Sequence, residues 1–491
     1  MKERLSRIDQ VPKDYRPGYE PGDYGMGIVH LGPGSFFKAH LAAFTDELIE
    51  KQGGDWRILG VSLRSRKTME ELVPQNGLYT LIAKSAEGRH CRVIGALADA
   101  ICSADNPEPA LAAMAARTTK IVSLTVTEKA YGLDRMATGC DPEHPAVAAD
   151  LLNPEEPRGV LGLITRALKL RREAKLPAFA VLCCDNLPEN GRLLRGAVID
   201  FAQRMDKDLA RWIADNAAFP STMVDRITPA PNEDTRREAA EAIGVQDSAA
   251  VETEGFRQWV IEDHFPQGRP DWDVVGAIFT KDVSSFETMK LRMLNGSHSM
   301  LAYAGFHAGC KYVRDVMSDA ALANLVKRHL DAASKTLRPI EGIDYSEYAD
   351  CLIERFRNPA IAHETFQIAM DGSEKMPQRI LSAVSDARAA GVDIRPFAFA
   401  TAAWIRHVSA STHDCPAYEI RDPKADELKK LAKGRHSIDI VAALRRLQFV
   451  PGSVRADDEF WSIVNPLLND MLTKPMTDAI ARETLQPEIS L

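Results

Sequence analysis

Short apolar runs and amphipathic stretches alternate through roughly the first 280 residues. The apolar runs, rich in β-branched and other apolar residues, occupy residues 27–32, 56–63, 120–127 and 179–186. Runs of this length and composition are typical of buried parallel strands. Helix-like segments lie between them, for example at residues 35–51 and 160–175. The repeated order of strand, helix and strand predicts a doubly wound, Rossmann-like α/β domain.

From about residue 284 the pattern changes to long helical periodicities. Examples are residues 321–337, 376–390, 397–408, 437–447 and 459–472. A chain of 491 residues is too long for a single hydrophobic core. We therefore expect two domains, an α/β domain over residues 1–283 and a mostly α-helical domain over residues 284–491.

The first long helical segment of the second domain, residues 286–305, carries three polar residues among apolar ones. On an α-helix that starts with Lys290 at zero, Asn295 falls at about 140° and His298 at about 80°. Leu291, Leu294 and other apolar residues share this arc. Burying polar groups on such a face costs free energy unless each has a partner or a task. The segment is therefore the first candidate for a functional site.

Composition and charge exclude several classes of protein. The chain is 45% hydrophobic and 26% charged, with a net charge of −8 and no basic block, so a nucleic-acid partner is not expected. No apolar run could span a membrane, and the first residues lack the apolar core of a secretory signal. The eight scattered cysteines fit a reduced, cytoplasmic protein, and no Cys/His cluster suggests structural or catalytic zinc. The sequence does not give the oligomeric state, and a monomer is compatible with it.

A glycine turn follows the first predicted strand. Gly32-Pro-Gly34 stands between that strand and a helix that starts at Ser35 and Phe36. In a Rossmann turn the first glycine permits the bend and the second lets the backbone approach a pyrophosphate at the helix start. Phe37 occupies the place of the third glycine, so the motif is incomplete. An ordinary strand-helix turn is the alternative.

The loop after the second strand bears on which dinucleotide is bound. NAD-binding folds usually end this strand with an acidic residue that holds the adenosine ribose. Here the loop carries Arg64, Arg66 and Lys67 instead. A basic loop in contact with the cofactor would tolerate a 2′-phosphate, whereas a solvated loop would have no such role. Both NAD and NADP stay open at this point.

Several blocks of the sequence resemble the mannitol dehydrogenase family of polyol-specific long-chain dehydrogenases. The resemblance covers nearly the whole chain, including IVHLGPGSFFKAH, SLTVTEKAYG, CDNLPENG, TMVDRITP and KLRMLNGSHSMLAY. That family includes mannitol 2-dehydrogenases and fructuronate reductases, and it uses NAD without a metal. The resemblance implies a dinucleotide-binding domain followed by a substrate-binding domain, with the active site in the cleft between them.

The resemblance also implies roles for individual residues. Lys290 matches the catalytic lysine, Asn186 and Asn295 match the two asparagines of the oxyanion hole, and His298 matches a histidine that contacts substrate. Lys375 matches a lysine that contacts substrate.

Other matches are less complete. Asp225 matches a residue near the nicotinamide and substrate, although it could instead pair with Arg226 or cap a helix. Thr127 and Glu128 are expected beside the nicotinamide ribose. Gln367 stands where some mannitol-oxidising members carry an arginine, a departure that weakens a specific assignment to mannitol.

The residue types suit the oxidation of a secondary alcohol. A lysine is a useful base only if its pKa falls well below about 10.4, and burial beside a positive nicotinamide lowers it. Amide donors such as those of Asn186 and Asn295 stabilise the charge that develops on the oxygen. The alternatives are a lysine that reaches solvent, a turn asparagine and a core histidine at position 298.

The sequence thus predicts an NAD(P)-dependent oxidoreductase that acts on a small linear sugar acid or polyol. D-mannonate/D-fructuronate ranks ahead of D-mannitol/D-fructose, and a non-catalytic nucleotide-binding redox sensor is the remote alternative. A substrate carboxylate calls for a cation, for which Lys375 is the first candidate. Arg379 and Arg406 are weaker candidates, because a structural ion pair is the usual role of a buried arginine.

Overall fold

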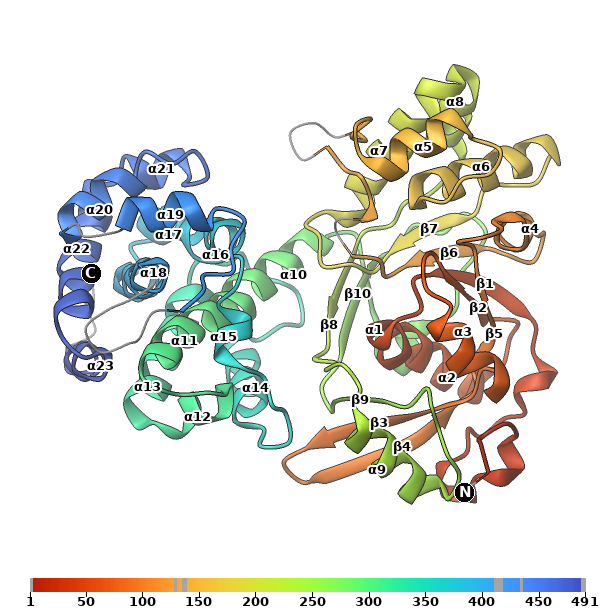
Figure 1. The fold of residues 1–491 in the computed structure, drawn as a ribbon, viewed down its shortest axis with the longest axis horizontal. Helices are drawn as coiled ribbons and strands as arrows, with labels where there is room; N and C mark the ends of the chain where they lie inside the picture. Colours follow the sequence, from red (N-terminus) through yellow and green to blue (C-terminus); the bar gives the residue numbers. More distant parts are fainter. Residues whose placement is uncertain (1–2, 128–129, 135–138, 410–417, 433–435, 487–491) are drawn as a thin grey trace. The chain divides into compact units, whose positions relative to one another are not determined.

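The computed structural model describes residues 3–127, 130–134, 139–409, 418–432 and 436–486. The chain divides into two compact units, Met1–Ser284 and Ser285–Leu491, called here the N-terminal and C-terminal units. The boundary expected from the sequence lies one residue from this division. The N-terminal unit is α/β and the C-terminal unit is helical, which confirms the predicted fold class (Figure 1).

A sheet of five parallel strands forms the centre of the N-terminal unit. The strand order is β5-β2-β1-β6-β7. The strands are β1 Met26–Leu31, β2 Arg57–Ser62, β5 Leu97–Cys102, β6 Ile121–Leu124 and β7 Ala180–Cys183. Strand order reverses between β1 and β6, and open α/β sheets bind ligands at the carboxyl ends of the strands beside such a reversal.

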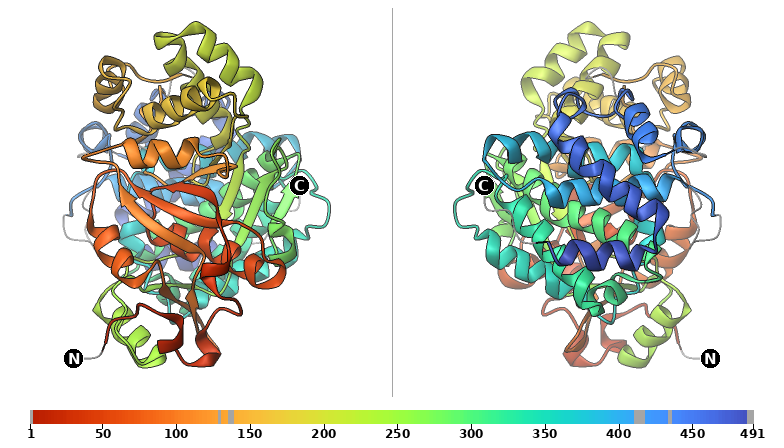
Figure 2. Two further views of the ribbon diagram at one scale, coloured as in Figure 1. Left: turned by 90° about the vertical axis from the view of Figure 1, so that its right-hand side faces the viewer. Right: turned by 90° about the vertical axis from the view of Figure 1, so that its left-hand side faces the viewer.

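Helices cover both faces of this sheet, so alternate strand residues enter two hydrophobic cores (Figure 2). Val29 and Leu31 of β1 belong to one core, and Ile28 belongs to the other. The helices of this unit are α1 Ser35–Ala39, α2 Leu41–Gln52, α3 Lys67–Leu72, α4 Glu108–Ala115, α5 Pro145–Leu152, α6 Val160–Glu173, α7 Asn190–Met205, α8 Lys207–Asn216 and α9 Glu233–Ile243. The helix predicted over residues 35–51 is interrupted at His40, whose φ of −118° and ψ of −91° are not helical.

Two three-stranded sheets complete the N-terminal unit. Their orders are β4-β3-β9 and β11-β10-β8. The strands are β3 Tyr79–Ser85, β4 Gly88–Ile94, β8 Thr222–Asp225, β9 Val251–Glu254, β10 Gln258–Glu262 and β11 Ile278–Thr280. Short 3₁₀ turns occur at Ile8–Gln10, Lys13–Tyr15, Pro21–Asp23, Val73–Gln75 and Trp272–Val275.

The helices of the C-terminal unit surround two long, buried ones, α11 Gly296–His307 and α18 Arg395–Val408 (Figures 1 and 2). The others are α10 Val283–Met289, α12 Val313–Ser318, α13 Ala320–Ser334, α14 Tyr345–Arg357, α15 Thr365–Ile368, α16 Gly372–Met376, α17 Ser382–Ala389, α19 Ala425–Ala432, α20 Ser437–Leu444, α21 Gly452–Arg455, α22 Asp458–Thr473 and α23 Met476–Thr484. Two π-helical turns, Lys290–Asn295 and Pro377–Leu381, pack against each other. Because α12, α13, α15 and α18 all contact α11, this helix is buried on every side.

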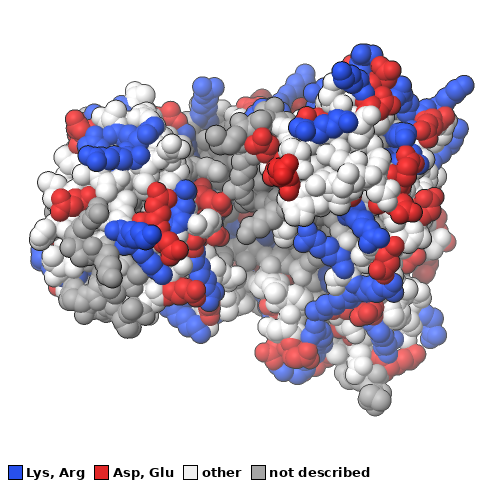
Figure 3. All heavy atoms as spheres, turned by 45° about the horizontal axis from the view of Figure 1, so that its top comes forward, with Lys and Arg blue, Asp and Glu red and all other residues white. Residues whose placement is uncertain are grey.

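Acidic and basic side chains are interspersed on the face drawn in Figure 3. Among the helices of the described residues, none is both long and apolar enough to cross a membrane. In the same part of the chain, no group of three or more His, Cys, Asp or Glu side chains could hold a metal ion.

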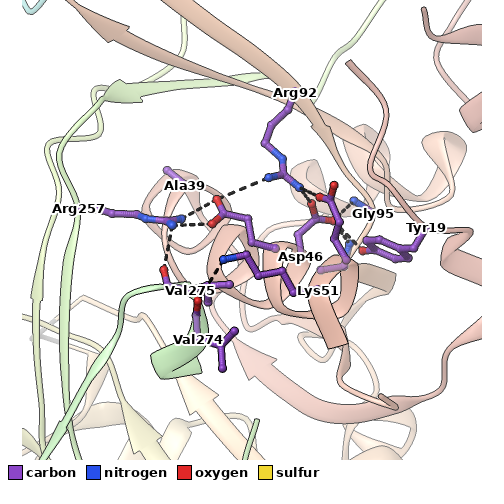
Figure 4. A network of polar contacts seen from close by, with 12 residues as sticks. Tyr19, Ala39, Asp46, Lys51, Arg92, Gly95, Arg257, Val274 and Val275 are labelled. Atoms are coloured by element: carbon purple, nitrogen blue, oxygen red, sulfur yellow. Dashed lines mark hydrogen bonds and ion pairs between the residues drawn. The ribbon is translucent and has the colours of Figure 1, made fainter. Parts of the chain in front are cut away.

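A buried carboxylate, Asp46 of α2, joins three segments of the N-terminal unit (Figure 4). It accepts hydrogen bonds from the Tyr19 hydroxyl at 2.7 Å and from the backbone N–H groups of Gly95 at 2.7 Å and Ala96 at 3.1 Å. The Arg92 guanidinium pairs with its other oxygen. Asp46 therefore holds the N-terminal segment and the end of the β3–β4 hairpin against α2.

We expect Asp46→Ala to lower the free energy of unfolding by about 3–5 kcal/mol, because it leaves Arg92 without a buried counter-charge. Glu50→Ala is a matched control, since Glu50 pairs with the same arginine at 3.1 Å but its side chain is 40% exposed. This change should cost no more than about 1 kcal/mol. Urea unfolding of both variants measures the difference. Equal losses would show that Asp46 has no special role.

Candidate functional site

The glycine turn lies at the carboxyl end of β1, next to β6. Gly32 has φ +86°, and a Cβ added there would lie 2.4 Å from the carbonyl oxygen of Thr125. A side chain at residue 32 is thus excluded by both conformation and space. At Gly34 an added Cβ would meet only the Gly32 carbonyl, at 3.9 Å, so the backbone there is open to a ligand.

Ser35 and Phe36 form the start of α1, directly after this turn. The first N–H groups of a helix have no intrahelical partner, which suits them to an anionic group. Phe37, in the place of the third glycine, is buried and stacks on the ring of His30 at 3.9 Å between centroids. The incomplete glycine motif therefore reflects an aromatic core contact beneath the turn.

The basic loop after β2 contains one arginine that differs from its neighbours. Arg66 pairs with Asp105, and Lys67 lies 3.9 Å from Glu71. Arg64 is exposed and makes no hydrogen bond or ion pair within the described part of the chain. Arg64 is thus the residue of this loop that is most available to a bound molecule.

The loop after β6 is held by the residue that precedes Asn186. The carboxylate of Asp185 accepts hydrogen bonds from the Val126 backbone N–H at 2.8 Å and from the Tyr131 hydroxyl. Thr127 in this loop is exposed, and Glu128 lies outside the described residues. The ends of β6 and β7 are thereby fixed to each other.

Asn186 is exposed at the end of β7, in a turn that a second asparagine braces. The side-chain amide of Asn190 donates to the carbonyls of Asp185 at 3.0 Å and Thr222 at 2.9 Å. Its oxygen accepts from the Thr222 backbone N–H at 2.9 Å. In this turn, Asn190 is structural, and Asn186 is the asparagine exposed to solvent and ligands.

Asp225 is buried at the end of β8. The guanidinium of the following Arg226 donates to the backbone carbonyls of Ala39 and Glu254, the latter at 3.1 Å. Asp225 is also close enough to His40 to affect the pKa of that residue, which burial lowers to about 3. These contacts place Asp225 near the junction of α1 and α2.

The C-terminal unit carries Lys290, Asn295 and His298 on a continuous helical segment. They are 9%, 8% and 7% exposed, so all three are shielded to the same degree. Lys290 and Asn295 are the first and last residues of a π-helical turn. Because a π-helix bonds residue i to i+5, these two residues lie closer to one face than the α-helical spacing predicted. His298 follows three residues later on α11, also on that face.

The arc opposite Lys290, Asn295 and His298 is buried as well, which the periodicity of the sequence does not indicate. Ser297, Ser299, Met300 and Tyr303, on the opposite arc, are also buried. The reason is that α11 lies inside the helical bundle, where packing covers its whole circumference.

In the candidate residues of this segment, two buried atoms lack hydrogen-bond partners within the described part of the chain. They are Nδ2 of Asn295 and Nε2 of His298. Leaving such a group unsatisfied costs about 1–3 kcal/mol. Ser297 Oγ and Tyr303 OH share this state, so the state alone does not mark a site. The spacing of Asn295 and His298 from Lys290 is what distinguishes them.

His298 is neutral and surrounded by aromatic rings and cations. Its ring lies 4.7 Å from Phe356 and 5.4 Å from His363, between centroids. Burial lowers the pKa of His298 well below 6.5, and the electrostatic effects of the neighbouring His363, Arg355, Arg379 and Lys375 lower it further. An uncharged imidazole of this kind can donate or accept a hydrogen bond but holds no fixed charge.

The remaining candidates differ in their surroundings. Lys375 is half-buried, with Nζ 3.4 Å from the Ile368 carbonyl and 3.9 Å from Asp371. Arg379 donates to Ser299 Oγ at 3.3 Å. Gln367 is exposed on α15. Lys375 and Arg379 are close enough to His298 to lower its pKa, whereas Gln367 lies at the surface.

Arg406 is fully buried, and its guanidinium donates to the backbone carbonyl of Met471. A second carbonyl, that of Lys474, lies at 3.5 Å. These contacts tie α18 to the end of α22, and they favour the structural role that the sequence left open for this arginine.

Sequence reasoning missed Asp185, Tyr131 and Asn190, which hold the backbone around Asn186 and Thr127. The DNLPENG block offered one signal for Asn190. It contains two asparagines, and the preference of asparagine for turns does not explain why both are present.

Comparison with known proteins gives consistent matches over the whole chain. Residues 26–274 match the model of the mannitol dehydrogenase Rossmann domain, and residues 282–470 match the mannitol dehydrogenase C-terminal domain. D-mannonate oxidoreductase of Escherichia coli is 43% identical over 448 residues, which cover 90% of this chain and 91% of that protein.

Two solved structures are similar over nearly their full length. The mannitol 2-dehydrogenase of Pseudomonas fluorescens, in a ternary complex with NAD and D-mannitol, has a TM-score of 0.86 and 33% identity, covering 99% of this chain and 100% of that one. A D-sorbitol dehydrogenase in substrate-free form has a TM-score of 0.90 and 34% identity, covering 97% and 100%.

Proposed function

The chain belongs to the mannitol dehydrogenase family of oxidoreductases that act on CH–OH groups, and from this premise we propose that its substrate is a linear sugar acid. The reaction would interconvert the secondary carbinol of D-mannonate and the ketone of D-fructuronate. The observation that carries the proposal is the common burial of Lys290, Asn295 and His298 on one helical segment, with an amide and a ring nitrogen that lack partners among the described residues.

NAD is the cofactor that fits the N-terminal unit. The glycine turn supports this fit, because a Cβ at residue 32 would collide with Thr125 and the backbone at Gly34 is open. Gly32, Gly34, Ser35 and Phe36 would hold the pyrophosphate. Thr127 and Glu128 would lie at the nicotinamide ribose. When bound, the nicotinamide supplies the hydride acceptor or donor.

In the oxidative direction, Lys290 would remove the proton from the carbinol oxygen. Burial disfavours the charged form of a lysine, and a base with a lowered pKa is what this step needs. The amides of Asn295 and Asn186 would donate to the oxygen as negative charge develops on it. Asn295 is pre-organised for this task, since its Nδ2 is buried without a partner within the described structure. Asp225 would lie beside the reacting groups.

His298 would bind a substrate hydroxyl near the reacting carbon. Because the pKa of His298 is far below 6.5, the imidazole stays neutral at working pH. A neutral ring discriminates hydroxyl positions by hydrogen bonding without attracting anions on its own. A negatively charged substrate group would instead be attracted by the cations near His298, which are Arg355, Arg379 and Lys375.

The preference for an acid rests on charge and on similarity. The chain is 43% identical to a D-mannonate oxidoreductase and 36% to 39% identical to three mannitol 2-dehydrogenases. Lys375 and Arg379 are among the cations that act on His298, and a carboxylate is best bound by such groups. A D-mannitol/D-fructose dehydrogenase, or another polyol dehydrogenase, is the second candidate, favoured by the similarity to the two solved structures.

Purified protein mixed with NAD and a panel of aldonates and polyols would decide between these candidates. Formation of reduced nicotinamide, followed by absorbance, should be fastest with D-mannonate. Fast oxidation of D-mannitol with no oxidation of D-mannonate would favour the second candidate. The absence of oxidation of every substrate, despite NADH binding, would contradict both.

We expect Lys290→Ala to lower turnover by about 10² to 10⁴, the range for loss of a general base, while NADH binding stays nearly unchanged. Lys311→Ala is the control, because Lys311 lies in the same unit but is 65% exposed. Oxidation by the unmodified enzyme should rise with pH as the lysine loses its proton. Near-normal turnover of Lys290→Ala at neutral pH would remove this residue from the mechanism.

Arg64→Asp should depress the use of NADP more than the use of NAD, because the change replaces a cation by an anion where a 2′-phosphate would lie. Arg117→Asp makes the same charge change at an exposed residue before β6, at the amino ends of the strands rather than at their carboxyl ends. The measurement is kcat/KM for each cofactor. An unchanged NADP/NAD ratio in Arg64→Asp would show that the loop is only a solvated surface.

Lys375→Met should lower kcat/KM for the aldonate or ketouronate far more than for the polyol or ketose. Charge-assisted hydrogen bonds are about twice as strong as neutral ones, so removal of the charge penalises the acid selectively. Lys375→Arg, which keeps the charge, should retain most of the preference for the acid. Equal losses for both classes in Lys375→Met would argue against a carboxylate at this position.

A further inference from the structure

The buried imidazole of His30 has two hydroxyl partners, one on the neighbouring strand β6 and one directly after that strand. Nδ1 lies 2.8 Å from Ser123 Oγ, and Nε2 lies 2.8 Å from Thr125 Oγ1. His30 and Ser123 face each other in the parallel pair of β1 and β6, and Thr125 follows two residues later. Side chains two residues apart project from the same face of a strand, so one ring can meet both hydroxyls.

The Thr125 hydroxyl has a further contact that sets its direction. It donates to the carbonyl oxygen of Gly32 at 2.8 Å. A threonine hydroxyl carries a single proton, which this bond uses. Toward His30 the same oxygen can therefore only accept, and Nε2 of His30 must carry the proton. Nδ1 is then unprotonated and accepts from the hydroxyl of Ser123.

We propose that these residues form a chain of hydrogen bonds in which each group donates to the next, from Ser123 through His30 and Thr125 to Gly32. We call this chain the relay, and we propose that it positions the glycine turn for the dinucleotide. The proposal rests on the proposed function, because it concerns the cofactor site named there. His30 and Thr125 would be positioning residues, since they act through the Gly32 backbone.

The geometry of Gly32 shows what the relay holds. Its N–H donates to the Val61 carbonyl of β2 at 2.9 Å, and its carbonyl also accepts from the Gly34 N–H at 2.7 Å. The Thr125 carbonyl fills the space where a Cβ would stand. With the Gly32 carbonyl held inward by two donors, the open backbone at Gly34 keeps one orientation.

The hydrogen bonds of the relay should not change with pH in the neutral range, because His30 stays uncharged there. Burial lowers the pKa of His30 to about 3, against a smaller opposing effect of the Gly32 backbone. The ring also stacks on Phe37 of α1, with centroids 3.9 Å apart and planes 19° apart. A neutral ring fixed in this way can serve as acceptor and donor at once, which a protonated ring cannot.

Thr125→Val and Thr125→Ser test the relay as a pair. Valine removes the hydroxyl at nearly constant volume, and it leaves the Gly32 carbonyl without one donor and His30 without its acceptor. We expect the dissociation constant for NADH, measured by fluorescence titration, to rise about tenfold. Serine keeps the hydroxyl and should restore binding to within about twofold. Turnover at saturating NAD should change much less than the dissociation constant.

Thr80→Val is the matched control. Thr80 lies in β3 of the same unit and is fully buried, and its hydroxyl has no hydrogen-bond partner among the described residues. The same chemical change there should leave NADH binding unaltered. If Thr125→Val lowers thermal stability but binds NADH as the unmodified protein does, the residue is merely structural and the proposal is overturned.

The tautomer of His30 gives a readout that needs neither cofactor nor activity. Side-chain ¹⁵N shifts of the unmodified protein, assigned by the signal missing from His30→Gln, should show a protonated Nε2 and an unprotonated Nδ1. The signal should not titrate between about pH 5 and pH 9. The opposite tautomer, or titration near neutral pH, would overturn the relay. Failure of the unmodified protein to bind NADH, with the expected tautomer present, would instead contradict the proposed function.

Discussion

Burial of polar groups is the constraint on which both units depend, because a buried donor or acceptor without a partner costs about 1–3 kcal/mol. In the N-terminal unit, His30 has two hydroxyl partners and Asn190 makes three hydrogen bonds to backbone groups. In the C-terminal unit Asn295 and His298 each keep a buried nitrogen without a partner among the described residues. The groups with partners hold backbone in place, whereas the nitrogens of Asn295 and His298 stand on the same segment as Lys290, which is the arrangement that the proposed function uses.

Much of the fold follows from local pattern. β1, β2, β6 and β7 were predictable because central parallel strands are continuous apolar runs. β5 was not, because it lies at the sheet edge and mixes buried residues with partly buried and exposed ones, such as the exposed Asp99. The β3–β4 hairpin was not predicted for the same reason, since several of its residues are exposed. Strands with one solvated side give a weaker signal than fully buried ones.

The candidate site was predictable where residue type and position coincide. Gly32 and Gly34 stand at a strand end, and Lys290, Asn295 and His298 are polar residues in an apolar helix. The π-helical turn was not predictable, because a change from i+4 to i+5 bonding within one turn leaves the apolar spacing almost unaltered. Burial around the whole of α11 depends on neighbouring helices that periodicity does not reveal.

Supporting residues are hidden from sequence for a different reason, which is distance along the chain. His30 and Ser123 are separated by 93 positions, and Asn190 and Thr222 by 32. The first pair is set by the register of β1 and β6, which a single sequence does not give, and the second by the packing of the start of α7 beside β8. Arg406 is only a weak ligand candidate in the sequence, and its guanidinium donates to backbone carbonyls at the end of α22, which agrees with the structural alternative. Whether a buried cation can bind a ligand depends on whether neighbouring backbone carbonyls already accept its hydrogen bonds, and the sequence does not show this.

The proposed chemistry and the proposed specificity occupy structurally different parts of the C-terminal unit. Lys290, Asn295 and His298 lie on a helical segment enclosed by its neighbours, where side chains have little freedom to move. Lys375 and Gln367 lie on short helices and are half-buried or exposed. Removing a carbinol proton demands the same base and donors from an acid or a polyol, whereas the far end of the substrate differs between them. A change of substrate is therefore easier to achieve on the short helices, since substitutions there need not disturb the packing of α11.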